Sequence, residues 1–150
     1  MANVPVISTL LNENSFLTDI KAGKHQFQSD EPVDLGGSDK ATDPLSMALA
    51  SLGACTAMTL KIYYAHKQTA WEKIEVQTTS ELEHIDKSTA SAEMLSMANN
   101  GKVRTITKVI YIKSDMDDKL LERAAIIADK CPVNLMMKKG CKMETIIKRI

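Results

Sequence analysis

The feature that most constrains this chain is a long run of small and apolar residues, DPLSMALASLGACTAMTLKIYYAHK, which extends from Asp43 to Lys67. Asp43 is a good helix N-cap, and Pro44 suits the first helical position because its missing N–H would have no partner there. The run is apolar on nearly every face, which is typical of a helix inside a protein. The sequence therefore predicts a helix over 44–67, ~35 Å long at ~1.5 Å per residue.

This helix also bears on assembly. Polar residues interrupt the run, so we interpret it as a buried core helix rather than a membrane span. These residues are Ser46, Ser51, Thr56, Thr59 and Lys61. A domain of 150 residues has difficulty covering so long an apolar helix alone. The sequence therefore indicates a homodimer in which a second copy covers part of the helix.

The rest of the chain predicts strands and helices in blocks. Gly23 can supply the positive φ of a hairpin turn in the first strand region, and later strands show apolar alternation. Residues 84–101 carry no clear pattern. The predicted elements are strands over 4–30, 71–83 and 102–113, helices over 116–130 and 132–139, and a last strand over 142–149. This order predicts a single α+β domain over 1–150, with antiparallel sheets wrapped around the buried helix.

Composition excludes several classes of protein. Lys plus Arg and Asp plus Glu number 19 each, so the formal charge is zero and a general nucleic-acid binder is not expected. The three cysteines form no C-x-x-C pair and no zinc-type cluster with histidine, so neither a structural metal nor a disulfide framework is expected. The first residues, MANVPVISTLLNENS, do not resemble a secretory signal. We expect a cytoplasmic protein with reduced thiols and no bound cofactor.

The cysteines differ in their local sequence. Pro132 directly after Cys131 predicts a helix start, where free backbone N–H groups and the helix dipole favour a thiolate. Cys131 is equally consistent with a small capping residue. Cys55 lies mid-helix, where a buried cysteine usually packs as a small apolar residue, so its reactivity requires a neighbouring charge or a partner thiol. Cys141 precedes the last strand and is expected to pack there.

Taken together, these motifs resemble the OsmC/Ohr family of thiol peroxidases. The segment GGSDKATDPLSMALASLGACTAMTL matches the family's Gly-Gly loop and proline-started central helix, with Cys55 eleven residues after Pro44. The second half of the resemblance is CPV at a helix start, which contains Cys131. The resemblance extends from about Lys24 to the end of the chain.

This resemblance implies an intertwined homodimer with the active site at the subunit interface. It implies that Cys55 is the peroxidatic cysteine, which attacks an organic hydroperoxide and becomes a sulfenic acid. It implies that Cys131 is the resolving cysteine, which condenses with that sulfenic acid to a disulfide. The implied partners are a small organic hydroperoxide and a dithiol reductant, lipoyl-type in some members.

The sequence departs from the better-known peroxidases of this family. Leu45 and Ser46 occupy the positions of a family glutamate, and no arginine precedes Arg104. Lys24 and His25, or a lysine of the other subunit, are the alternatives for stabilising the Cys55 thiolate. The GKHQ stretch that contains Lys24 and His25 resembles a less-characterised OsmC-like branch more than the Ohr type.

Two hypotheses follow from these observations. The first is a thiol-dependent peroxidase, which the two cysteines favour. The second is a non-catalytic OsmC-fold protein that binds a small apolar or electrophilic ligand at the dimer interface, which the departures at Leu45 and Ser46 favour. The first hypothesis requires Cys55 and Cys131 to come within disulfide range.

Overall fold

The computed structural model describes residues 4–10, 13–86 and 88–149. The chain forms two compact units, Met1–Ala48 and Leu49–Ile150, and each is described by itself. The boundary falls inside helix α1 (Pro44–Lys67), so no linker separates the units. The sequence alone predicts one domain, because it has no shift in composition at this boundary.

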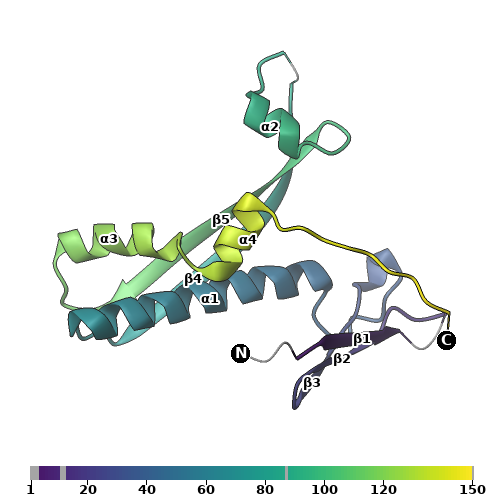
Figure 1. Ribbon diagram of the computed structural model, residues 1–150, viewed down its shortest axis with the longest axis horizontal. Helices are drawn as coiled ribbons and strands as arrows, with labels where there is room; N and C mark the ends of the chain where they lie inside the picture. Colours follow the sequence, from purple (N-terminus) through teal and green to yellow (C-terminus); the bar gives the residue numbers. More distant parts are fainter. Residues whose placement is uncertain (1–3, 11–12, 87, 150) are drawn as a thin grey trace. The chain divides into compact units, whose positions relative to one another are not determined.

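The first unit contains a three-stranded antiparallel sheet (Figure 1). The strands are β1 (Val6–Leu10), β2 (Thr18–Ala22) and β3 (His25–Ser29), in that spatial order. Gly23 makes the predicted turn between β2 and β3 with a φ of 61°. The sheet leaves many apolar side chains exposed, including Val6, Ile7 and Phe27.

A loop organised by Asp30 joins this sheet to α1 and contains the short 3₁₀ helix η1 (Val33–Leu35). The buried carboxylate of Asp30 accepts hydrogen bonds from the backbone N–H groups of Glu31, Ser38 and Lys40 and from the Ser38 hydroxyl. The Ser38 hydroxyl is the main reason that the pKa of Asp30 lies below its ordinary value. A Cβ on Gly37 would lie 1.8 Å from the Glu31 carbonyl oxygen, so only glycine fits there.

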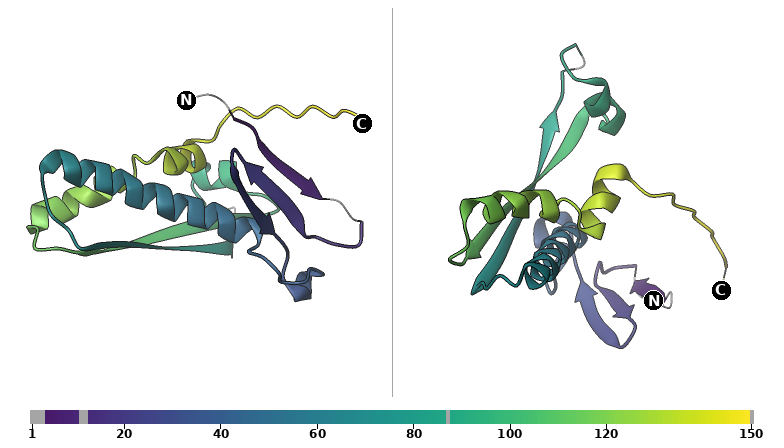
Figure 2. Two further views of the ribbon diagram at one scale, coloured as in Figure 1. Left: turned by 90° about the horizontal axis from the view of Figure 1, so that it is seen from below. Right: turned by 60° about the vertical axis from the view of Figure 1, so that its left-hand side comes forward.

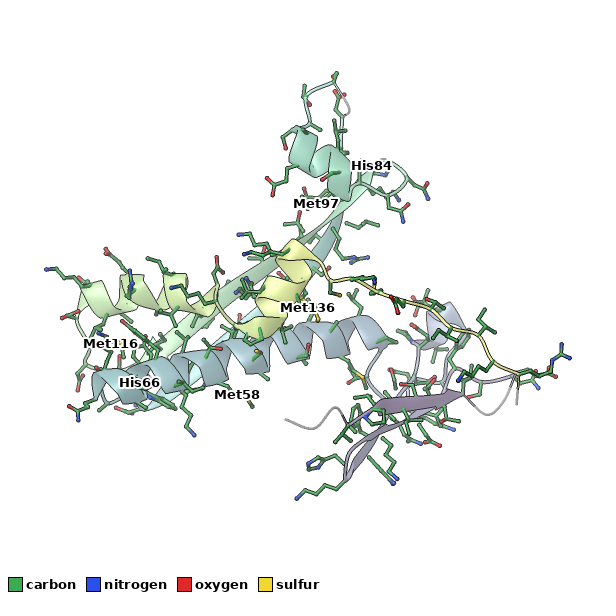
Figure 3. The ribbon with its side chains drawn as sticks, in the orientation of Figure 1. Met58, His66, His84, Met97, Met116 and Met136 are labelled. Carbon is green, nitrogen blue, oxygen red and sulfur yellow. The ribbon has the colours of Figure 1, made fainter. Side chains whose placement is uncertain are left out.

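Helix α1 begins and ends where the sequence predicts. The Asp43 carboxylate caps it by accepting the Ser46 N–H at 2.9 Å. One face is buried in the second unit, through Leu52, Gly53, Thr56, Leu60 and Tyr64. The other face is exposed: Met58 is 63% and Ile62 is 61% accessible, and Met58 projects away from α4 in Figure 3. The helix is therefore central but only half covered by its own chain.

By length and composition, α1 is the one helix among the described residues that passes a test for a membrane span. The core helix of a globular protein passes the same test.

The second unit is built on a long antiparallel hairpin. β4 (Lys73–His84) pairs along its whole length with β5 (Lys102–Lys113), from Lys73–Lys113 to His84–Lys102. Residues 84–101, which carry no clear sequence pattern, include helix α2 (Ala92–Met97) near the end of this hairpin. The left view of Figure 2 shows α1, α3 and α4 over the same face of the hairpin.

Two helices complete this unit. α3 (Asp118–Ala128) is shorter than the predicted 116–130, and Asp117 is its N-cap. α4 (Pro132–Lys139) coincides with the predicted 132–139, with Cys131 as N-cap and Gly140 as C-cap. A core of Leu60, Tyr64, Ala124 and Ala128 joins α1 to α3.

The strand predicted over 142–149 is wrong for this chain. Residues 140–149 have no regular secondary structure, and Met143, Ile146 and Ile147 are exposed. A strand requires a neighbour to accept and donate its backbone hydrogen bonds. The segment contains the β-branched residues Thr145, Ile146 and Ile147, but none of the described strands of the same chain pairs with it.

Candidate functional site

The two cysteines singled out by the sequence lie together in the second unit. Cys55 is in the middle of α1 and half-buried, whereas Cys131 lies at the start of α4 and is fully buried. The Cys55 side chain is one of the influences that lower the pKa of Cys131. Oγ1 of Thr56, which follows Cys55, lies 3.6 Å from the Cys131 sulfur. The segments that carry the two cysteines therefore meet within one chain.

Local sequence explains the setting of Cys131. Pro132 fixes the first helical position, so Cys131 takes the extended N-cap conformation with φ −63° and ψ 140°. Its sulfur accepts the N–H of Asn134 at 3.2 Å. This N–H is one of the backbone donors that the first turn of a helix leaves without an intrahelical partner.

A partly buried lysine supplies positive charge near Cys131. Lys108 of β5 is only 13% accessible at its side chain. Its Nζ donates to the Asn134 amide oxygen at 2.8 Å and forms an ion pair with Asp129 at 3.2 Å. The Asn134 side chain also donates to the Asp129 carbonyl at 2.9 Å. These contacts hold the ammonium group beside the first turn of α4.

These contacts determine the acidity of Cys131. Burial raises the pKa of this thiol, and is the largest single influence. Hydrogen bonds from the Thr56 hydroxyl, the Asn134 N–H and the Cys55 thiol, together with the charge of Lys108, act in the opposite direction. Their sum prevails, so the pKa of Cys131 lies below its ordinary value and the thiolate is favoured.

A pocket of about 330 Å³ adjoins this network and shares Lys108 and Asn134 with it. Its walls combine apolar side chains with several cations. The remaining lining residues are Leu52, Met97, Arg104, Ile106, Asp129, Met137 and Lys138. Such a pocket suits a small molecule with an apolar body.

The other predicted residues are elsewhere. Lys24 lies in the β2–β3 turn and His25 begins β3; both are exposed in the first unit. Their predicted role as thiolate stabilisers stays a prediction. Cys141 is exposed after α4 instead of packed in a strand. Leu45 is exposed, and the Ser46 N–H serves the cap of α1.

Sequence reasoning missed Thr56, Lys108 and Asn134 as site residues. One signal was available for Lys108, because it stands between Ile106 and Ile110 in the row of β5 that faces the helices. A lysine in an apolar row needs a partner when buried. Asn134 carried a weaker signal, as the third residue after a predicted N-cap.

The fold and the site define an α+β protein whose cysteine pair is held between a core helix and the N-terminus of a second helix. The model of the OsmC-like protein family matches residues 37–146. The chain therefore belongs to the OsmC-like family, which agrees with the resemblance found in its motifs.

Solved structures support the same assignment. An OsmC-like protein from Mycoplasma pneumoniae superposes with a TM-score of 0.68 at 18% identity, over 92% of this chain and 88% of the other. An organic hydroperoxide resistance protein from Legionella pneumophila has a TM-score of 0.64 at 16% identity, over 92% of each chain. One from Elizabethkingia anophelis has a TM-score of 0.61 at 16% identity, over 93% of each. A comparison with curated protein sequences finds no significant match. At these identities the similarity confirms the predicted fold alone.

Proposed function

We propose that this chain is a cysteine-based peroxidase that reduces organic hydroperoxides. Cys55 attacks the terminal peroxide oxygen and becomes a sulfenic acid, and Cys131 condenses with it to a disulfide. The contact between Thr56, which follows Cys55, and the Cys131 sulfur at 3.6 Å carries this proposal. A resolving thiol near the sulfenic acid would limit over-oxidation.

The surroundings of the pair support this division of roles. Cys55 is half-buried, so a small molecule can reach it, whereas Cys131 has no accessible surface. The adjacent pocket has several apolar side chains in its walls, which favour an organic hydroperoxide over hydrogen peroxide. Two of the similar structures are described as organic hydroperoxide resistance proteins.

The proposal includes the surroundings in which the protein works. It acts as a homodimer in the cytoplasm. Its reductant is a dithiol of the lipoyl type, and it has no nucleic-acid or membrane partner. The exposed apolar face of α1, with Met58 and Ile62, supports the dimer, because a second copy would remove this surface from water.

The test uses the reduced protein and one equivalent of cumene hydroperoxide. The expected product has lost two hydrogen atoms by intact mass, and peptide mapping places the link between Cys55 and Cys131. Cys55→Ser should abolish the link, and Cys141→Ser should leave it unchanged. Thiols that stay unmodified after long exposure would exclude the peroxidase.

A non-catalytic binding protein is the second candidate function, and one observation favours it. Leu45 and Ser46 supply no carboxylate where the resemblance expects a glutamate, and the Ser46 N–H is engaged by Asp43. In that case the pocket of about 330 Å³ holds a small apolar or electrophilic ligand without turnover. Unreacted thiols together with saturable binding of a thiol-reactive or apolar probe would support this candidate.

A further inference from the structure

The two thiols present an asymmetry that the proposed roles do not explain. The hydroperoxide can reach Cys55, which is half-buried, but the contacts that favour an ionised sulfur converge on Cys131, which is fully buried. Peroxide attack requires a thiolate at the attacking sulfur. The accessible thiol therefore needs a way to lose its proton.

We propose that Cys131 is the base for Cys55: the buried Cys131 thiolate accepts the Cys55 proton while the Cys55 sulfur attacks the hydroperoxide. This inference rests on the proposed peroxidase function and deepens it. Cys131 then has two successive tasks, activation of Cys55 and resolution of its sulfenic acid.

The geometry supports a base at this position. A thiolate at Cys131 accepts the Asn134 N–H at 3.2 Å and the Thr56 hydroxyl at 3.6 Å. Cys55 directly precedes Thr56, so the thiol to be deprotonated belongs to the turn of α1 that contacts the Cys131 sulfur. Burial keeps the thiolate away from the hydroperoxide, because Cys131 has no accessible surface.

The charged and titratable groups around Cys131 come from three elements. β5 contributes the ammonium group of Lys108, and α1 contributes the Cys55 thiol. Asp129, after the end of α3, contributes a carboxylate that is 3.2 Å from Lys108 and 57% accessible. The charge of Lys108 acts to lower the pKa of Cys131. Lys108 is thus a positioning residue that acts through Cys131.

The first step balances as follows. The Cys55 sulfur forms a bond to the terminal peroxide oxygen, and the O–O bond breaks with loss of alkoxide. Cys55 is oxidised by two electrons and the hydroperoxide is reduced. The thiol proton moves to the Cys131 sulfur and then to the alkoxide, which leaves as alcohol. Cys131 is again a thiolate.

In the second step the Cys131 sulfur attacks the Cys55 sulfur. The S–S bond forms, the S–O bond breaks, and hydroxide leaves and takes a proton from solvent to become water. The external dithiol later reduces the disulfide.

The decisive experiment measures the first step in the absence of Cys131. Cys131→Ser in a Cys141→Ser background leaves Cys55 as the sole thiol, and serine keeps a good N-cap for α4. Reaction with cumene hydroperoxide is stopped at intervals with dimedone, and trapped sulfenic acid is measured by mass across a range of pH. We expect oxidation of Cys55 to slow by about a hundredfold, as for loss of a general base. Its rate should also rise steadily with pH.

Two further variants test the base role of Cys131 independently. Cys131→Asp restores a base and a good N-cap but cannot form a disulfide, so it should recover much of the first-step rate and accumulate sulfenic acid. Lys108→Met keeps both thiols and should shift the pH profile of the first step to higher pH. Lys113→Met, an exposed lysine on the same strand and outside this pocket, is its control and should leave the profile in place.

The outcomes separate the two proposals. If Cys55 in the Cys131→Ser variant is oxidised at the wild-type rate with the wild-type pH profile, the base role is overturned and the peroxidase proposal stands. If the wild-type protein does not react at all, the peroxidase proposal fails and the base role fails with it.

Discussion

The two cysteines of the candidate site have different positions in their helices and therefore different hydrogen-bond donors around them. Cys55 lies in the middle of α1, where each backbone N–H is used by the helix itself, and even the Cys55 carbonyl accepts a bond from the Thr59 hydroxyl at 2.8 Å. Cys131 is the N-cap of α4, where the Asn134 N–H has no partner within the helix and binds the Cys131 sulfur. The comparison teaches that a thiol at the start of a helix has a free backbone donor beside it, whereas a mid-helix thiol has none from its own helix.

The strongest test of this comparison removes one thiol at a time. Cys55→Ser in a Cys141→Ser background should abolish reaction with cumene hydroperoxide altogether, because the one remaining thiol, Cys131, is buried. Mass spectrometry of the treated protein measures this directly. Oxidation of Cys131 in this variant at a wild-type rate would reverse the comparison and make the buried thiol the point of attack. Cys141→Ser, which changes an exposed cysteine, is the matched control and should react normally.

The next test concerns the hydroxyl that binds Cys131. Thr56→Val keeps the shape of a fully buried side chain but removes its hydrogen bond to the sulfur. A hydrogen bond to a charged group contributes about 1.5 kcal/mol, so the pKa of Cys131 should rise by about one unit. Thiolate absorbance in a Cys55→Ser, Cys141→Ser background measures the pKa of Cys131.

Thr59→Val is the matched control on the same helix. Its hydroxyl binds the Cys55 carbonyl, so its loss should leave the titration of Cys131 in place. Equal shifts in both variants would mean that α1 as a whole, rather than the Thr56 hydroxyl, sets the acidity of Cys131.

The sequence predicted the two helices better than the contact between them. Proline after a capping residue fixes the starts of α1 and α4 by local rules, and both begin where predicted. The pairing of Thr56 with Cys131 joins positions 75 residues apart, and Lys108 enters from β5. No local pattern encodes such proximity. The family resemblance did imply the cysteine pair, but not the residues around it.

The prediction of a last strand over 142–149 was wrong for a related reason. Residues 142–149 contain three β-branched residues, but pairing depends on a neighbouring edge that local sequence cannot specify. The same applies to Lys24 and His25, whose predicted approach to Cys55 requires a particular placement of the first unit.

A smaller effect is expected on stability. The pKa of Cys131 is lowered in the folded protein, so the unfolded chain binds more protons between the folded and unfolded pKa values. The stabilisation is complete above the unfolded pKa of about 8.5 and is lost as pH falls through the folded pKa. The stability of the reduced protein relative to Cys131→Ser should therefore increase with pH up to about 9. Urea unfolding in a non-thiol reductant measures the free energy of unfolding of both proteins. A difference between them that decreases with pH would contradict the lowered pKa.

The smallest expected effect has the opposite sign and comes from Asp129. Its carboxylate offsets part of the Lys108 charge that acts on Cys131, so Asp129→Asn should lower the pKa of Cys131 further. The pair is 57% accessible on the Asp129 side, and exposed ion pairs contribute at most about 1 kcal/mol, so the shift should be well under one unit. Thiolate titration in the Cys55→Ser, Cys141→Ser background measures the pKa of Cys131. Lys108→Met is the comparison variant and should raise this pKa. If both changes shift the titration the same way, Lys108 acts by holding Asn134 in place rather than by its charge. The comparison would then depend on the geometry of the α4 N-terminus alone.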